Sequence, residues 1–197
     1  YKAAGAGFAK WRAAFAINKD LGTPSEHAID ANSTIMALYA GICQRNGVVP
    51  IVEPEVLLKG DYSIEDKREV MRSVYESLFA ALRKYQVHLP GVILKTSMVH
   101  SGHEASTWAS AEEVGIQTAQ LLAEAIPEEL GGIVFLSGGL SGDTARTFLN
   151  QISQSQSEYM CNKTSFSFAR AVQGEPTEIW AGDDANLAAA HQRYLEL

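Results

Sequence analysis

Cysteine is scarce in this chain, and it has no long apolar runs. Its two cysteines, Cys43 and Cys161, lie far apart and outside any Cys-X-X-Cys or histidine-rich context. We therefore expect neither a disulfide framework nor a zinc site, and we expect a reducing, cytoplasmic setting. No apolar stretch approaches the roughly 20 residues of a membrane span, and residues 1–20 lack a secretory pattern, so no membrane partner is expected.

Runs of basic residues are missing as well. The formal net charge is −7, from 16 basic and 23 acidic side chains, and the lysines and arginines are scattered along the chain. This pattern disfavours a nucleic-acid-binding protein, and an anionic ligand would need a local cluster of cations. The hydrophobic content of 46% is sufficient for a sizeable core, which excludes a disordered chain.

Short apolar runs alternate with longer amphipathic segments. The runs predict buried strands at Gly7–Ala13, Val48–Glu53, Gly91–Lys95, Ile133–Ser137 and Thr164–Arg170. Helices are expected between them. The first has Thr23 as its N-cap, Pro24 at the first helical position and Glu26 at the third. Similar starts occur at Ser63 and Ser110, and further helices are expected over 142–152 and 183–197.

Strand alternating with helix indicates an α/β fold with a parallel sheet, either doubly wound or closed as a barrel. A polar residue ends each predicted strand, and these residues recur about every 40 residues, the length of one βα unit: Lys10, Glu53, Lys95, Ser137 and Arg170. No GxGxxG or Walker A sequence follows any strand. The regular repeat, with a polar residue at each strand end, favours a (β/α)8 TIM barrel.

The number of strands is too small for a complete barrel. TIM barrels typically run to about 250 residues, and this chain provides five βα units in 197. The chain also starts at Tyr1, without a methionine, and enters its first strand almost at once. We therefore expect residues 1–197 to form a partial TIM-barrel catalytic domain that lacks about three N-terminal units.

Two lysines are the candidate reactive groups. Lys95 closes an apolar run that would carry it to the barrel mouth, where desolvation and a second cation favour the free amine that forms a Schiff base with a carbonyl. A single lysine at a strand end more often snorkels to water. Lys10 changes that balance, because alternation places Lys10 and Arg12 on one side of their strand and Trp11 on the other.

Carboxylates and a glycine turn complete the candidate site. Glu53 and Glu55 are two residues apart in an extended segment, so they share a side and can transfer protons or balance the lysines; an exposed acidic loop is the alternative. Pro50 and Pro54 are expected at the two ends of this strand. The turn at Ser137, Gly138 and Gly139, followed by a helix start, could hold a phosphate together with Arg170, although paired glycines are usually only turns: Ser137-Gly138-Gly139-Leu140-Ser141.

A metal or other cofactor is not expected. His100 and His103 follow a strand at a spacing that zinc ligands use, but no third ligand of matching context is present. A loop role or indirect support of the site is the preferred interpretation of both histidines.

These motifs resemble class I, Schiff-base fructose-bisphosphate aldolases. The resemblance spans essentially the whole chain and implies strands four to eight of the barrel. Its motifs are Phe8-Ala9-Lys10-Trp11-Arg12, Val49-Pro50-Ile51-Val52-Glu53-Pro54-Glu55, Leu94-Lys95, Phe135-Leu136-Ser137-Gly138-Gly139, Ala169-Arg170-Ala171 and Trp180-Ala181-Gly182. The family usually has Pro-Asn where this chain has Thr96-Ser97, and glycine where it has Ala169.

The resemblance implies an activity and a role for each site residue. The reaction is the reversible cleavage of fructose 1,6-bisphosphate to dihydroxyacetone phosphate and glyceraldehyde 3-phosphate in glycolysis or gluconeogenesis, in a homo-oligomer, a tetramer by resemblance. Lys95 would form the Schiff base, with Glu53 as acid and base. The supporting roles are catalysis by Glu55 and Lys10, and binding of the phosphorylated sugar by Arg12, Ser137, Gly138, Gly139 and Arg170.

Other interpretations stay open. The polypeptide as given could be a non-catalytic fragment, or a phosphate-binding or protein-binding remnant, and we expect the isolated 197 residues to be inactive. Another Schiff-base barrel lyase is less favoured, because it would not predict both Glu53-Pro54-Glu55 and Ser137-Gly138-Gly139.

Overall fold

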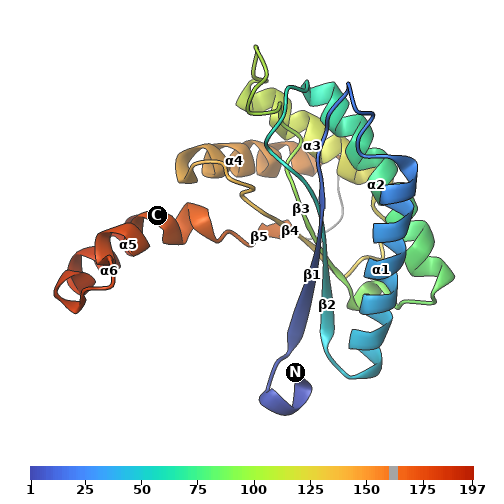
Figure 1. The fold of residues 1–197 in the computed structure, drawn as a ribbon, viewed down its shortest axis with the longest axis horizontal. Helices are drawn as coiled ribbons and strands as arrows, with labels where there is room; N and C mark the ends of the chain where they lie inside the picture. Colours follow the sequence, from blue (N-terminus) through green and yellow to red (C-terminus); the bar gives the residue numbers. More distant parts are fainter. Residues whose placement is uncertain (160–163) are drawn as a thin grey trace.

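The computed structural model describes residues 1–159 and 164–197 (Figure 1). Five parallel strands form one sheet: β1 (Phe8–Phe15), β2 (Val49–Val56), β3 (Ile93–Thr96), β4 (Gly132–Phe135) and β5 (Thr164–Phe166). Six α-helices alternate with and follow them: α1 (Glu26–Arg45), α2 (Ile64–Lys84), α3 (Ala111–Ala125), α4 (Gly142–Tyr159), α5 (Arg170–Trp180) and α6 (Leu187–Glu196). Short 3-10 turns cover Lys2–Ala4, Leu89–Gly91 and Asp184–Asn186.

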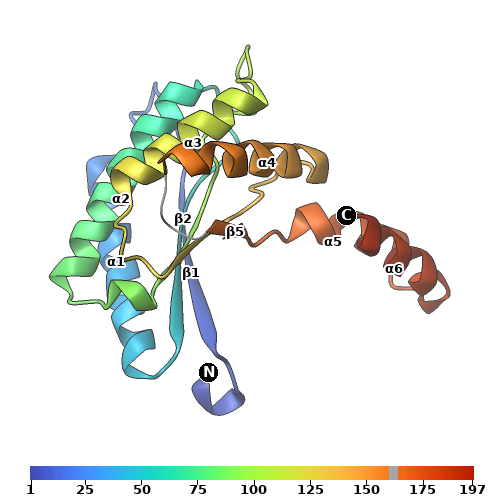
Figure 2. The same cartoon turned by 180° about the vertical axis from the view of Figure 1, so that it is seen from behind.

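The strand order confirms the predicted α/β class and distinguishes between the two parallel folds. Neighbours in the sheet follow chain order, β1-β2-β3-β4-β5, as in a (β/α)8 barrel, whereas a doubly wound sheet reverses direction at a switch point. Among the described residues, β1 and β5 are the two edges of this sheet. Figures 1 and 2 show α1, α2 and α3 beside the strands, while α5 and α6 extend away from them.

Serine side chains start three of the helices. The Ser63 side chain and Asp66 form a reciprocal capping box at α2, and Ser110 Oγ accepts from the Glu113 amide at 3.2 Å, as predicted. The predicted cap of α1 is wrong: Ser25, not Thr23, accepts from the Ala28 amide at 3.2 Å. Thr23 is held elsewhere, because its backbone pairs with Asn18 in an isolated antiparallel bridge.

Several predicted strand ends are also wrong. Lys10 and Glu53 lie inside β1 and β2, because these strands pair with each other over all eight residues. Pro50 and Pro54 likewise lie within β2 rather than at its ends. Only Ile51 and Val52 of β2 are in register with β3, so both prolines lie outside the part of the strand paired on two sides.

The last two helices differ most from the prediction. The strand expected to reach Arg170 ends at Phe166, and Arg170 begins α5, a helix that the sequence pattern did not predict. Gly174 and Pro176 lie inside α5, and both disfavour a helix interior, which explains why the pattern was missed. The helix expected over 183–197 is shorter and runs over Leu187–Glu196.

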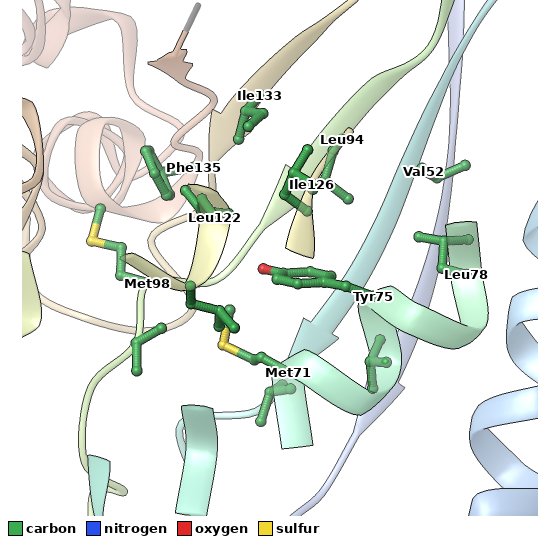
Figure 3. Close-up of a cluster of buried hydrophobic side chains, with 14 of the residues drawn as sticks. Val52, Met71, Tyr75, Leu78, Leu94, Met98, Leu122, Ile126, Ile133 and Phe135 are labelled. Carbon is green, nitrogen blue, oxygen red and sulfur yellow. The ribbon is translucent and has the colours of Figure 1, made fainter. Parts of the chain in front are cut away.

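The core lies between the sheet and its helices (Figure 3). Strand residues that alternate along the chain point into it and meet side chains of α2 and α3: Val52, Leu94, Ile133, Phe135, Met71, Tyr75, Leu78 and Leu122. All of these are at most 1% exposed. Because successive strand residues face opposite sides, Glu53 and Lys95 are directed to the other face of the sheet.

Cys43 of α1 is a buried free thiol, and Cys161 lies outside the described residues. Within the described part of the chain, no helix is both long and apolar enough to cross a membrane.

Candidate active site

Strand β1 supplies two cations to one face of the sheet. Lys10 and Arg12 each pair with a carboxylate of β2, while Trp11 points the other way and its ring lies 5.5 Å from the Tyr39 ring of α1. This is the alternation that the sequence predicts. Arg12 is paired in register with Glu53 in the β1–β2 ladder, which brings the cations of β1 next to the carboxylates of β2.

The two carboxylates of β2 share the same face and are almost fully buried. Glu53 is 4% exposed and Glu55 is 6% exposed, which rules out the alternative of an exposed acidic loop. Arg12 Nε donates to Glu55 Oε2 at 2.5 Å. This hydrogen bond and the charge of Glu55 raise the pKa of Arg12, so the guanidinium is held in its charged form.

Glu53 lies between the two lysines. Lys10 Nζ is 2.8 Å from Glu53 Oε2, and Lys95 Nζ is 3.4 Å from Glu53 Oε1. The Lys10 contact is an ion pair whose geometry falls outside that of a hydrogen bond, since Glu53 Oε2 has no hydrogen-bond donor among the described residues. The Lys95 side chain is 14% exposed, against 40% for Lys10, so Lys95 is the more enclosed amine.

The turn after β4 lies beside Glu55, since a Cβ atom on Gly138 would be 3.7 Å from Glu55 Oε1. The backbone φ angles of Gly138 and Gly139 are 57° and 96°, a region that L side chains rarely adopt. A Cβ atom on Gly139 would lie 3.7 Å from Arg170 Nη2, so the turn and this guanidinium are close neighbours. None of the hydrogen bonds found among the described residues uses the Gly138 or Gly139 amide, and both N–H groups are available to a ligand.

A cleft of about 190 Å³ brings together seven of the nine predicted site residues: Arg12, Glu53, Glu55, Lys95, Ser137, Gly138 and Arg170. Leu136, Ser167 and Ala169 also line it. Lys10 does not line this cleft itself, but it pairs with Glu53, which does. Gly139 lines an adjoining cleft of about 510 Å³ that shares Arg12, Glu55, Gly138 and Arg170.

The charges of this region favour an anionic ligand. Four cations face two carboxylates: Lys10, Arg12, Lys95 and Arg170 against Glu53 and Glu55. An amine beside a carboxylate, in one cleft with a guanidinium and free backbone amides, is an arrangement that can form an imine with a phosphorylated carbonyl compound.

The histidine loop contacts the buried face of α2. His100 is buried, and its Nε2 lies 2.7 Å from Nζ of Lys67, which is fully buried on α2. His100 Nδ1 lies 2.8 Å from the Ser101 carbonyl, so Nδ1–H donates there and Nε2 accepts from Lys67. Across the described ranges, no group of three or more His, Cys, Asp or Glu side chains could hold a metal ion.

Sequence reasoning missed Lys67 and also the cleft residue Ser167. Lys67 lies at helical spacing between the apolar residues Ile64 and Met71, so a charged side chain on the buried face of α2 was the available signal. Burial is the main cause that lowers the pKa of Lys67, and the charge of Glu55 offsets part of this effect. Burial, followed by the charge of Lys67, lowers the pKa of His100.

Comparisons with known proteins agree with this geometry. The family model for class I fructose-bisphosphate aldolase matches residues 1–197. A fructose-bisphosphate aldolase of Encephalitozoon cuniculi is 44% identical over 191 residues, which cover 96% of this chain and 55% of that protein. A probable class 1 fructose-bisphosphate aldolase of Xanthomonas axonopodis pv. citri is 44% identical over 197 residues, covering 100% and 58%.

A solved structure has the same fold. The fructose-bisphosphate aldolase of Plasmodium falciparum, crystallised in a ternary complex with TRAP and a small-molecule inhibitor, superposes with a TM-score of 0.94 at 38% identity. The alignment covers 99% of this chain and 56% of that chain. The chain thus spans about half the length of the relatives that it matches, and it belongs to the class I fructose-bisphosphate aldolase family.

Proposed function

We propose that the protein carrying this chain cleaves fructose 1,6-bisphosphate reversibly, to dihydroxyacetone phosphate and glyceraldehyde 3-phosphate, through a Schiff base on Lys95. The observation that carries the proposal is the 3.4 Å contact between Lys95 Nζ and the buried carboxylate of Glu53, in a cleft that also holds Arg170. The proposed Schiff-base chemistry needs no metal ion.

The proton transfers are assigned to the buried carboxylates. The Lys95 amine attacks the ketose carbonyl carbon, and Glu53 takes up the proton that the attacking nitrogen releases. Glu53 then gives this proton to the resulting hydroxyl, and water leaves as the imine forms. Lys10 holds Glu53 through their ion pair. Glu55, paired with Arg12, balances the cations and fixes the Arg12 guanidinium toward the substrate.

The ketose phosphate is assigned to the glycine turn and Arg170. The Gly138 and Gly139 amides and the Arg170 guanidinium supply donors without competing partners among the described residues, and Ser137 adds a hydroxyl. The class of substrate is thus a phosphorylated sugar.

The setting of this activity is proposed as well. Three apolar side chains of α1, Ile35, Leu38 and Ile42, are 45%, 45% and 53% exposed and lie at helical spacing, which supports a homo-oligomer. A tetramer and a cytoplasmic location are what the resemblance to the family implies.

The test is aldol cleavage by the full-length protein that carries this sequence. Cleavage is expected to proceed in the presence of EDTA and to be abolished by Lys95→Met. Lys84→Met, on the exposed end of α2, is the matched control and is expected to behave as wild type. Loss of activity on chelation, or full activity of Lys95→Met, would contradict the proposal.

A further inference from the structure

The position of Lys95 is not fixed by the β2–β3 ladder. The register of that ladder ends at the pair Val52 and Leu94, one residue before both Glu53 and Lys95. On its other side β3 stays paired, Lys95 with Val134 and Thr96 with Phe135 of β4, so the 3.4 Å contact between Lys95 and Glu53 depends on that ladder and on the contacts of the residues that follow Lys95. That stretch, residues 96–101, is buried along its whole length.

Helix α2 reaches the first residue of this stretch through Tyr75. The Tyr75 hydroxyl lies 2.6 Å from Thr96 Oγ1, and both residues are fully buried. Figure 3 shows the ring extending from α2 into the core, with the hydroxyl oxygen at its far end. Burial raises the pKa of Tyr75, which keeps the phenol protonated.

The same helix reaches the stretch again through Lys67. The Lys67 Nζ lies 2.7 Å from His100 Nε2, and the His100 ring stacks with the rings of Trp108 and Phe148, with centroids 6.3 Å from each. A lysine buried without a carboxylate contact carries a desolvation penalty, so this contact is a specific constraint on the position of His100.

Strand geometry connects these contacts to the reactive amine. Thr96 and Lys95 are consecutive in β3, so Thr96 faces α2 while Lys95 faces the cleft. A shift of Thr96 toward or away from α2 therefore moves the Lys95 amine relative to Glu53. Displacements of about 1 Å at a reacting group can lower a rate by up to about a hundredfold.

We propose that Tyr75 and Lys67 are positioning residues for Lys95: their buried contacts with Thr96 and His100 hold residues 96–101 and thereby fix the Lys95 amine against Glu53. This inference rests on the proposed Schiff-base function. It assigns a role in the reaction to a helix that lines neither cleft.

The test is the rate of borohydride trapping with saturating dihydroxyacetone phosphate, with the modified residue mapped by mass spectrometry. Tyr75→Phe is expected to slow trapping on the order of tenfold and to leave the affinity for inorganic phosphate unchanged. The double variant Tyr75→Phe/Thr96→Val is expected to be trapped no more slowly than Tyr75→Phe, because the two substitutions remove the same contact, the one between Tyr75 and Thr96. Lys67→Met is expected to slow trapping in the same direction.

Tyr62→Phe is the matched control. Tyr62 is also buried and donates a hydrogen bond, to the Leu57 carbonyl at 2.5 Å, but it does not touch residues 96–101 through its hydroxyl. Its trapping rate is expected to equal that of wild type. If Lys67→Met fails to fold, the trapping rate of Tyr75→Phe alone tests the positioning role.

The outcomes separate this inference from the proposed function. If wild-type protein is not labelled at Lys95, the proposed function fails and this inference with it. If Lys95 is labelled but Tyr75→Phe traps at the wild-type rate, or if Tyr62→Phe slows trapping equally, the positioning role is wrong while the Schiff-base function stands.

Discussion

Arg170 is the cation of the cleft that meets no carboxylate among the described residues. Its three counterparts are paired, Lys10 and Lys95 with Glu53 and Arg12 with Glu55, whereas the Arg170 guanidinium faces the glycine turn. A charged donor beside free backbone amides is the arrangement that phosphate oxygens need. Ligand affinity should therefore depend more on Arg170 than on the reactive lysine.

Arg170→Ala is expected to weaken binding of the ketose phosphate by roughly tenfold to a hundredfold, because a hydrogen bond to a charged group contributes about 1.5–3 kcal/mol. Lys95→Ala is expected to weaken it far less. Isothermal titration calorimetry on both variants measures the difference. Arg83→Ala removes an exposed arginine of α2 and serves as control; unchanged affinity in Arg170→Ala would remove Arg170 from the site.

Burial of Lys67 makes the stability of the fold depend on pH. Its folded-state pKa lies well below the ordinary value for lysine, so the unfolded chain binds a proton that the folded chain has released. In the window between these two pKa values the free energy of unfolding rises with pH. This contribution is complete above the unfolded-state pKa and is lost as pH falls through the folded-state value.

Lys67→Met is expected to flatten the rise of the free energy of unfolding with pH, because the variant lacks the amine that titrates. Urea unfolding between pH 7 and 10 measures this change. Lys84→Met, an exposed lysine on the same helix, is expected to keep the wild-type slope. A slope that is identical in wild type and Lys67→Met would show that Lys67 keeps its proton in the folded state.

The helix that carries Tyr75 and Lys67, α2, is stabilised at its N-terminus by a capping box. Ser63 and Asp66 satisfy each other's backbone amides at the first turn of α2, with contacts of 2.7 Å and 3.2 Å. Ser63→Ala is expected to lower the free energy of unfolding by about 1 kcal/mol. Ser73→Ala changes an exposed serine in the middle of α2 and is expected to be neutral or slightly stabilising; equal losses in both variants would contradict the capping role.

Elements with a clear period could be predicted from the sequence, and those with conflicting signals could not. The apolar spacing of α1, α2 and α3 and the short apolar runs of the strands identified the alternation of the fold. Helix α5 was missed because Gly174 and Pro176 argue against a helix, while packing against α4 and α6 supports one. Strand pairing lengthened β1 and β2 beyond the predicted ends, since pairing depends on a neighbour that local pattern does not reveal.

In the candidate site, too, local patterns could be read from the sequence and contacts between distant elements could not. Strand alternation predicted that Lys10 and Arg12 share one side of their strand and that Glu53 and Glu55 share one side of theirs, and the ion pairs between the two strands agree with this. The contact between Lys67 and His100 joins α2 to the loop after β3 and depends on burial, which a single sequence does not display.

At the scale of the whole molecule, the two sheet edges govern the behaviour of the 197-residue polypeptide on its own. Strands β1 and β5 each have one unpaired side among the described residues, and Phe8 and Phe166 on these strands are 63% and 54% exposed. Unpaired edges with apolar side chains promote association. Size-exclusion chromatography with light scattering is expected to show oligomers or aggregates, and the polypeptide alone is expected to lack aldol cleavage activity. A soluble monomer that cleaves fructose 1,6-bisphosphate would contradict this.

Lys95 is the residue proposed to form the covalent bond to substrate. The most direct measurement is peptide mapping of the full-length protein that carries this sequence, after reduction with borohydride in the presence of dihydroxyacetone phosphate. One modified lysine, Lys95, is expected, and labelling should not change when EDTA is added. Modification at Lys10 instead, or no modification at Lys95, would contradict it.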